Sequence, residues 1–178
     1  MKEKFIKKYK NIGILGGTFD PPHVGHLHIV DVALKKFKLD SVMWVVTKQN
    51  PLKKNPYLSV KTRINLSTEI TKKYKKISIK YFDNKIKSNS TFDLLKFIKK
   101  KNKKAKLFFL IGADNMIKMH KWKNWKKIPE LAKIIVFARS KYSTKALSSI
   151  VSKKFRKGDW VYINSKKIDI SSSLIRKF

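Results

Sequence analysis

Short apolar runs alternate with segments of helical periodicity along the whole chain, and this alternation restricts the fold more than any other feature of the sequence. Buried strands are predicted at residues 12–15, 41–47, 107–111, 133–138 and 160–163, and a strand nearer to a sheet edge at 77–81. Helical patterns fall between and after them, at residues 27–37, 59–70, 90–98, 146–155 and 171–177. Strands that alternate with helices indicate an α/β protein with a doubly wound parallel sheet. Ligands of such sheets bind at the carboxyl ends of the strands.

Two of the predicted helices begin with residues that commonly cap helix N-termini. Ser59 precedes one of them. Ser90 precedes the other, where Asp93 completes a pattern similar to a capping box and suits the positive end of the helix dipole. The polar stretch 83–89 predicts a loop, and residues 114–130 predict two short helical pieces.

The composition of this 178-residue chain is typical of one globular domain, because 42% of it is hydrophobic and 12% aromatic. The absence of cysteine excludes a disulfide framework, a thiolate nucleophile and a Cys-ligated metal. The longest apolar stretch, residues 107–113, is far shorter than the roughly 20 residues of a membrane-spanning helix. Residues 1–10 are basic and lack the apolar core of a secretory signal. We therefore expect a cytoplasmic protein that does not act at a membrane.

The net charge of +33 arises from 44 Lys and Arg residues against 11 Asp and Glu residues. Arginine occupies only positions 63, 139, 156 and 176, which leaves 40 lysines spread over nearly every segment. Proteins that read nucleic acids favour arginine, whose planar guanidinium matches phosphate and guanine. We interpret the lysines mainly as solvated surface and expect no specific nucleic-acid partner. Such a charge still concentrates anions, including nucleotides, near the protein.

The segment GGTFDPPHVGH at residues 16–26 has the features of a phosphate-binding loop. Gly16 and Gly17 let the backbone approach a ligand, and the helix that follows directs its first amides toward an anion. His23 and His26 stand at that helix start; either taken singly is more often a packed or capping residue, but together with the glycines, Pro21-Pro22 and the strand–loop–helix context they favour a phosphate site. With four histidines and no cysteine in the chain, we expect no protein-held metal. The segment lacks G-x-G-x-x-G and G-K-[ST], which disfavours a dehydrogenase or a P-loop kinase.

This segment resembles the HxGH form of the signature of the nucleotidylyltransferase superfamily. A second segment, ISSSLIR at residues 170–176, resembles the ISSTxIR signature of the same superfamily. The resemblance implies a Rossmann-like nucleotidylyltransferase fold, with residues 1–178 forming a single domain. It also implies that the ISSSLIR helix packs back on the ATP site, so that the two signatures meet.

Within the superfamily, the chain resembles the bacterial nicotinate-nucleotide adenylyltransferases over nearly its whole length. The matching segments are NPLKK at 50–54, TFDLL at 91–95, FLIGADN at 109–115, KWKNW at 121–125 and VFAR at 136–139. The chain departs from the family pattern at Leu52 and Lys53, where Pro and His are usual, and at Ser90, where Tyr is usual. Ser140-Lys141 likewise replaces the usual Pro-Gly. The departures concern the pyridine side of the site more than the ATP side.

The resemblance implies an enzyme of NAD biosynthesis that joins ATP and nicotinate mononucleotide, giving nicotinate adenine dinucleotide and pyrophosphate. The attacking phosphate is already ionised, so the reaction needs alignment and charge neutralisation rather than a general base. Mg²⁺ is expected to arrive on ATP. The implied catalytic residues are His23, His26 and Arg176. The implied ATP-binding residues are Gly16, Gly17, Thr18, Phe19, His23, His26, Gly112, Asp114, Arg139, Ser171, Ser172 and Arg176, and the implied mononucleotide-binding residues are Asn50, Lys53, Lys54, Thr91 and Trp122.

Simpler roles stay open for several of these residues. Asp114 also suits a helix cap, Trp122 also suits core packing next to Trp125, and Lys53 and Lys54 also suit solvated surface. Three alternative functions stay open as well. They are a phosphopantetheine adenylyltransferase, an enzyme that prefers the amide mononucleotide, and a basic nucleic-acid-binding module. The sequence does not indicate an oligomeric state.

Overall fold

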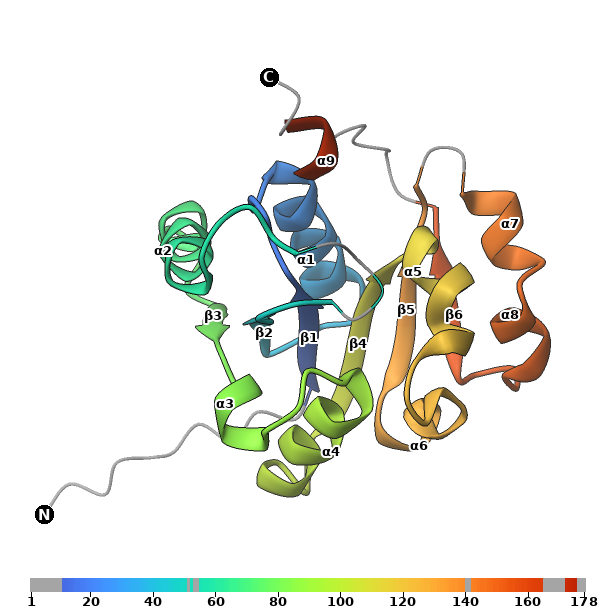
Figure 1. The fold of residues 1–178 in the computed structure, drawn as a ribbon. Helices are drawn as coiled ribbons and strands as arrows, with labels where there is room; N and C mark the ends of the chain where they lie inside the picture. Colours follow the sequence, from blue (N-terminus) through green and yellow to red (C-terminus); the bar gives the residue numbers. More distant parts are fainter. Residues whose placement is uncertain (1–10, 51, 53–54, 140–141, 165–171, 176–178) are drawn as a thin grey trace, which may run out of the picture.

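The structure is a computed structural model that describes residues 11–50, 52, 55–139, 142–164 and 172–175. Its centre is a six-stranded sheet in the order β3-β2-β1-β4-β5-β6, in which all neighbouring strands are parallel (Figure 1). The predicted doubly wound parallel sheet is thereby confirmed, with β3 at an edge. The strands are β1 (Asn11–Gly17), β2 (Ser41–Val46), β3 (Ile77–Lys80), β4 (Lys106–Gly112), β5 (Lys133–Phe137) and β6 (Trp160–Ile163).

Helices cover both faces of this sheet. One face carries α1 (Val24–Lys36) and α2 (Val60–Thr71). The other carries α4 (Thr91–Lys101), α5 (Ala113–Lys118), α6 (Ile128–Leu131), α7 (Ser143–Leu147) and α8 (Ile150–Lys154). The remaining short elements are α3 (Asp83–Ile86), η1 (Met119–Lys121), η2 (Trp125–Lys127) and α9 (Ser172–Ile175). None of the helices within the described ranges is long and apolar enough to cross a bilayer.

Successive residues of the central strands are buried on opposite faces, as a sheet covered on both sides requires. In β4, Phe109 and Ile111 belong to the core under α4 to α8, whereas Leu110 belongs to the core under α1 and α2. In β5, Ile134 and Ile135 divide in the same way. The short apolar runs of the sequence are therefore the central layer of a three-layer protein.

Local signals predicted the helix starts well and two connections poorly. Ser59 caps α2 through the Thr62 amide, and Ser90 caps α4 through the Asp93 amide, as expected. The predicted loop at 83–89 is wrong in its first half, because α3 forms there and ends at Ile86, followed by Lys87 with a φ of 52°. The single helix predicted at 146–155 is also wrong, because α7 and α8 are separate helices with Ser149 capping the second.

The topological switch point of the sheet lies between β1 and β4. After β1 the chain enters α1 on one face, and after β4 it enters α5 on the other. The two connections therefore diverge and open a crevice at the carboxyl ends of the strands. The loop after Gly17 forms one side of this crevice, and the start of α5 at Ala113 forms the other.

Candidate active site

A cavity of about 780 Å³ occupies this crevice. It is bordered by segments that follow β1, β2 and β4, by the start of α4, and by Ser172 of α9. Of the site residues predicted from sequence, those that line it are Gly16, Gly17, Thr18, Phe19, His26, Asn50, Thr91, Gly112, Asp114, Trp122, Arg139 and Ser172. Lys53, Lys54, Ser171 and Arg176 lie outside the described residues.

The two histidines of the first loop are stacked on each other at the start of α1. Their ring centroids lie 3.8 Å apart and their planes are 29° apart. The His23 amide donates a hydrogen bond to Nδ1 of His26 at 3.2 Å, so the proton of a neutral His26 ring is on Nε2. Phe19 and Trp44 meet the His26 ring edge to face, at 4.9 and 5.7 Å. The orientation of His26 is therefore fixed by its surroundings.

His23 lies behind His26 rather than on the cavity lining. It is only 5% exposed, and neither of its ring nitrogens has a hydrogen-bond partner among the described residues. Burial and the nearby charge of Arg139 lower the pKa of His23 to about 4. The ring is therefore neutral at pH 7, with two polar atoms that no described residue satisfies next to the loop after β1.

Two aspartates hold the loops that border the cavity. Asp20 precedes a cis peptide bond to Pro21, and its two carboxylate oxygens accept from the amides of residues 57 and 58, each at 2.9 Å. Asp83 accepts from Thr47 Oγ1 and from the amide of residue 48, both at 2.7 Å. Ser172 of α9 donates from Oγ to the Pro21 carbonyl at 2.8 Å. These contacts join segments far apart in sequence around one cavity.

Arg63 of α2 is the most extensively bonded side chain behind these loops, and sequence reasoning did not identify it as part of the site. It is 1% exposed and donates to four backbone carbonyls. The acceptors are those of Leu58 at 3.0 Å, Thr18 at 2.6 Å, Thr47 at 2.7 Å and Lys48 at 2.9 Å. One signal was available, because Arg63 is one of four arginines among 40 lysines. A fork of several donors is what arginine has and lysine lacks.

The start of α5 presents an ion pair to the cavity. Arg139 Nη1 lies 2.9 Å from Oδ2 of Asp114, and both residues line the cavity. Oδ1 of Asp114 is buried and has no partner among the described residues. A Cβ at Gly112 would lie 2.5 Å from that same oxygen, so a glycine leaves the space in which the carboxylate sits. Asp114 thus borders the cavity with one carboxylate oxygen that no described residue satisfies.

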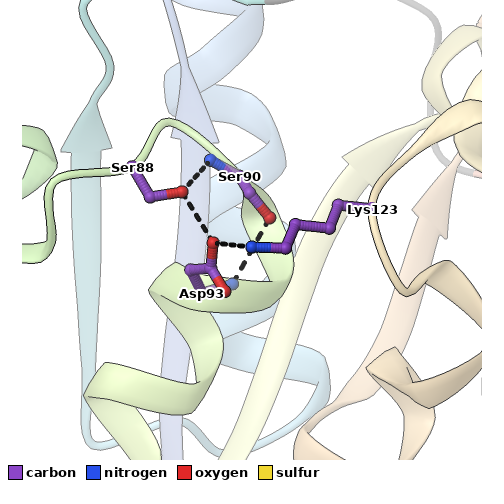
Figure 2. Close-up of polar contacts among 4 residues, drawn as sticks. All are labelled: Ser88, Ser90, Asp93 and Lys123. Carbon is purple, nitrogen blue, oxygen red and sulfur yellow. Dashed lines mark hydrogen bonds and ion pairs between the residues drawn. The ribbon is translucent and has the colours of Figure 1, made fainter.

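A second group of lining residues gathers at α4 and between η1 and η2. Thr91 is the first residue of α4, and Trp122 meets Phe109 edge to face with centroids 6.2 Å apart. Trp125 packs instead against Phe155 of the core, at 5.5 Å, as expected. Figure 2 shows the polar contacts beside this group, in which Asp93 of α4 is paired with Lys123 at 2.9 Å.

Asn50 lines the cavity at the end of the loop after β2, where its Oδ1 accepts from the Leu52 amide at 2.9 Å. This contact is a local turn and leaves the amide nitrogen of Asn50 for a ligand. The lining thus combines two kinds of surface. Backbone amides, His26 and Arg139 suit phosphate, while Trp122 and the start of α4 suit an aromatic ring that carries an anionic group.

Comparison with known proteins agrees with this geometry. Residues 14–178 match the cytidylyltransferase-like family model. The chain is 42% identical over 171 residues to a Pelagibacter ubique protein named "Probable nicotinate-nucleotide adenylyltransferase", covering 96% of this chain and 94% of that protein. A Ruegeria protein of the same name is 40% identical over 128 residues, covering 72% and 67%.

Among solved structures, the chain is similar to the nicotinic acid mononucleotide adenylyltransferase of Plasmodium falciparum, solved in complex with NaAD. The TM-score is 0.77 and the sequence identity 27%, with 95% of this chain and 83% of that chain covered. The likeness therefore extends across the sheet and both helical layers.

Proposed function

The chain belongs to the nicotinate-nucleotide adenylyltransferases, within the cytidylyltransferase-like family, and we propose that its cavity joins ATP to nicotinate mononucleotide. The products are nicotinate adenine dinucleotide and pyrophosphate, which is a step of NAD biosynthesis. One observation carries this assignment to the cavity. A single space at the switch point of the sheet is lined both by the first loop with His26 and by Trp122 with the start of α4. It can therefore take two nucleotides side by side.

The chemistry is a displacement at phosphorus. A phosphate oxygen of the mononucleotide attacks the α-phosphorus of ATP, and the bond from that phosphorus to the oxygen bridging to the β-phosphate breaks. The electron pair leaves with pyrophosphate. Because the attacking oxygen is already ionised, no proton has to be removed by the protein. The protein aligns the two phosphates and stabilises the charge that grows on them.

We assign charge stabilisation to the start of α1 and the residues around it. His26 offers Nε2–H, and the first amides of α1 favour an anion. His23 is proposed to act from behind, because its buried ring stacks on that of His26 and keeps it in place. Arg139 adds a permanent positive charge at the cavity. Arg176 and Ser171 are proposed to join them from the second signature, and the bond from Ser172 to Pro21 supports that placement.

Binding of the nucleosides follows from the remaining lining residues. We propose that the free oxygen of Asp114 accepts from ribose hydroxyls of ATP. Trp122 stacks on the pyridine ring, and Thr91 together with the first amides of α4 receives its carboxylate. Asn50, Lys53 and Lys54 are proposed to hold the phosphate of the mononucleotide. The positive end of α4 favours the acid over the neutral amide.

We propose that Mg²⁺ enters as part of the MgATP substrate, in keeping with its preference for phosphate oxygens. Among the described residues, no three His, Cys, Asp or Glu side chains gather as a metal site would require. We also propose that residues 1–178 act as one domain in the cytoplasm and that the +33 charge serves no specific nucleic acid.

A substrate comparison tests the assignment. Purified protein is incubated with MgATP and with nicotinate mononucleotide, nicotinamide mononucleotide or phosphopantetheine, and pyrophosphate release is followed while mass spectrometry identifies the product. We expect nicotinate adenine dinucleotide as the main product and slower turnover of the amide. Preferential turnover of phosphopantetheine, or no adenylyl transfer to any of the three acceptors, would overturn the proposal.

A further inference from the structure

A closed set of polar contacts lies beside the mononucleotide end of the cavity (Figure 2). Oδ2 of Asp93 accepts from Ser88 Oγ at 2.7 Å and from Lys123 Nζ at 2.9 Å. Ser88 Oγ accepts in turn from the Ser90 amide at 3.1 Å, and Ser90 Oγ accepts from the Asp93 amide at 3.4 Å. The first turn of α4 and the residues before it are thereby fixed to one carboxylate.

Lys123 connects this turn to a different part of the chain. Its partner Asp93 is 30 positions away, two residues after Thr91. Lys123 itself follows Trp122 directly, and both lie between η1 and η2. The ion pair is therefore a direct side-chain link between the two segments that supply Thr91 and Trp122 to the cavity lining.

The exposure of the two side chains favours a role in positioning the neighbouring segments over a role in stabilising the fold. The Lys123 side chain is 60% exposed, and ion pairs at such sites contribute little to folding. Asp93 is 24% exposed and cannot relax freely into water. Its burial alone would raise the pKa, but hydrogen bonds from Ser88 and Lys123 outweigh burial and lower the pKa below its ordinary value. The contacts from Ser88 and Lys123 thus favour the charged form of the carboxylate, the form that pairs with Lys123.

We propose that Asp93 and Lys123 are positioning residues for nicotinate mononucleotide, which hold Trp122 and the first turn of α4 in the fixed relation that the pyridine ring requires. The inference rests on the proposed function and deepens it. Neither residue needs to touch the substrate for this role. Ser88, in the loop before α4, supports this role because its hydroxyl donates a hydrogen bond to Oδ2 of Asp93.

Steady-state kinetics on a small set of variants tests the proposal. Lys123→Met and Asp93→Asn each remove the charge pair, and each is expected to raise KM for the mononucleotide about threefold to tenfold, with KM for ATP nearly unchanged. Lys123→Arg keeps the link and is expected to stay near wild type. The double variant should be no worse than the poorer single variant, because both changes break one interaction. Lys127→Met is the matched control, since Lys127 is an exposed lysine of η2 outside the cavity lining.

Other outcomes overturn the proposal in recognisable ways. If Lys123 instead contacts the substrate directly, Lys123→Met raises KM while Asp93→Asn leaves it unchanged or lowers it. If the pair serves only the fold, both variants lower the melting temperature and change both KM values equally.

A measurement without substrate separates this inference from the proposed function. In protein labelled with 5-fluorotryptophan, the fluorine resonance of Trp122 is assigned by its loss in Trp122→Phe. Lys123→Met and Asp93→Asn should shift or broaden that resonance, whereas Lys127→Met should not. An unmoved resonance with normal wild-type turnover defeats the positioning role alone. A wild type that makes no dinucleotide defeats the proposed function, whatever the resonance does.

Discussion

His23 lies directly behind His26, with the two rings stacked at 3.8 Å, and only His26 reaches the cavity. The two histidines therefore differ in position: His26 lines the cavity, and His23 is buried behind it. His26 presents a donor whose direction is set by the His23 amide, and His23 backs it with a neutral ring that burial keeps unprotonated. The donor that faces the cavity is therefore oriented before any ligand binds.

The first prediction follows from that arrangement. Replacing His26 with Ala should lower kcat by roughly 10²–10³-fold, because one preorganised donor to the reacting phosphates is lost. His23→Ala should also lower kcat strongly, since it removes the ring against which His26 stacks. Melting temperatures should stay close to that of the wild type. His28→Gln changes a histidine of the same helix outside the lining and is the control. Wild-type kinetics in His26→Ala would refute the role.

The pKa of His23 predicts a dependence of stability on pH. Its folded-state value of about 4 lies below its ordinary 6.5, so between these values the unfolded chain binds more protons than the folded one. The contribution to stability is complete above pH 6.5 and is lost as pH falls toward 4, by on the order of 2–3 kcal/mol. Urea unfolding at pH 7 and pH 4.5 should therefore give a larger difference for the wild type than for His23→Gln. Equal differences would show that His23 titrates normally.

Arg63 predicts a loss of both stability and activity. Arg63→Met removes the buried donor of four part-buried carbonyl contacts, which should lower the free energy of unfolding by about 2–4 kcal/mol. Activity should fall as well, because the loops after β1 and β2 lose their common anchor. The exposed Arg156→Met is the control for loss of an arginine charge. A stability change in Arg63→Met no larger than the control would contradict the anchoring role.

Gly112→Ala should damage the site while sparing the fold. The added Cβ would lie 2.5 Å from Asp114 Oδ1, which is the end of a side chain and can move aside. The displaced carboxylate loses its alignment with Arg139, so we expect KM for ATP to rise about tenfold, the scale of one charge-assisted hydrogen bond. Thermal unfolding measures the fold separately. An unchanged KM for ATP would place Asp114 outside the nucleotide contacts.

The sheet was predictable because strand burial depends on local sequence. A run such as residues 107–111 is apolar at every position, which predicts a strand buried on both faces by helices. The structure has that arrangement. The caps Ser59 and Ser90 were predictable for the same reason, since a cap acts within one turn. The break between α7 and α8 was missed because the apolar pattern of residues 146–155 continues across Ser149. A serine inside such a pattern can be an ordinary helix residue or the cap of a new helix, and the sequence does not distinguish the two.

The site was predictable where its residues follow strands and unpredictable where distant segments meet. Asp114 and the first loop come directly after β4 and β1, so strand assignment alone brings them together. Arg63 donates hydrogen bonds to carbonyls of residues up to 45 positions away, and Lys123 forms an ion pair with a carboxylate 30 positions away. Neither contact leaves a local pattern in the sequence.

The bond from Ser172 to Pro21 spans 151 positions of the chain. The ribosome therefore synthesises the glycine-rich loop and the six strands of the sheet before it synthesises Ser172, which lines the cavity. A nascent chain that already holds its sheet still lacks the part of the cavity lining that Ser172 supplies. The cavity lining is thus completed only after the last strand of the sheet has been synthesised.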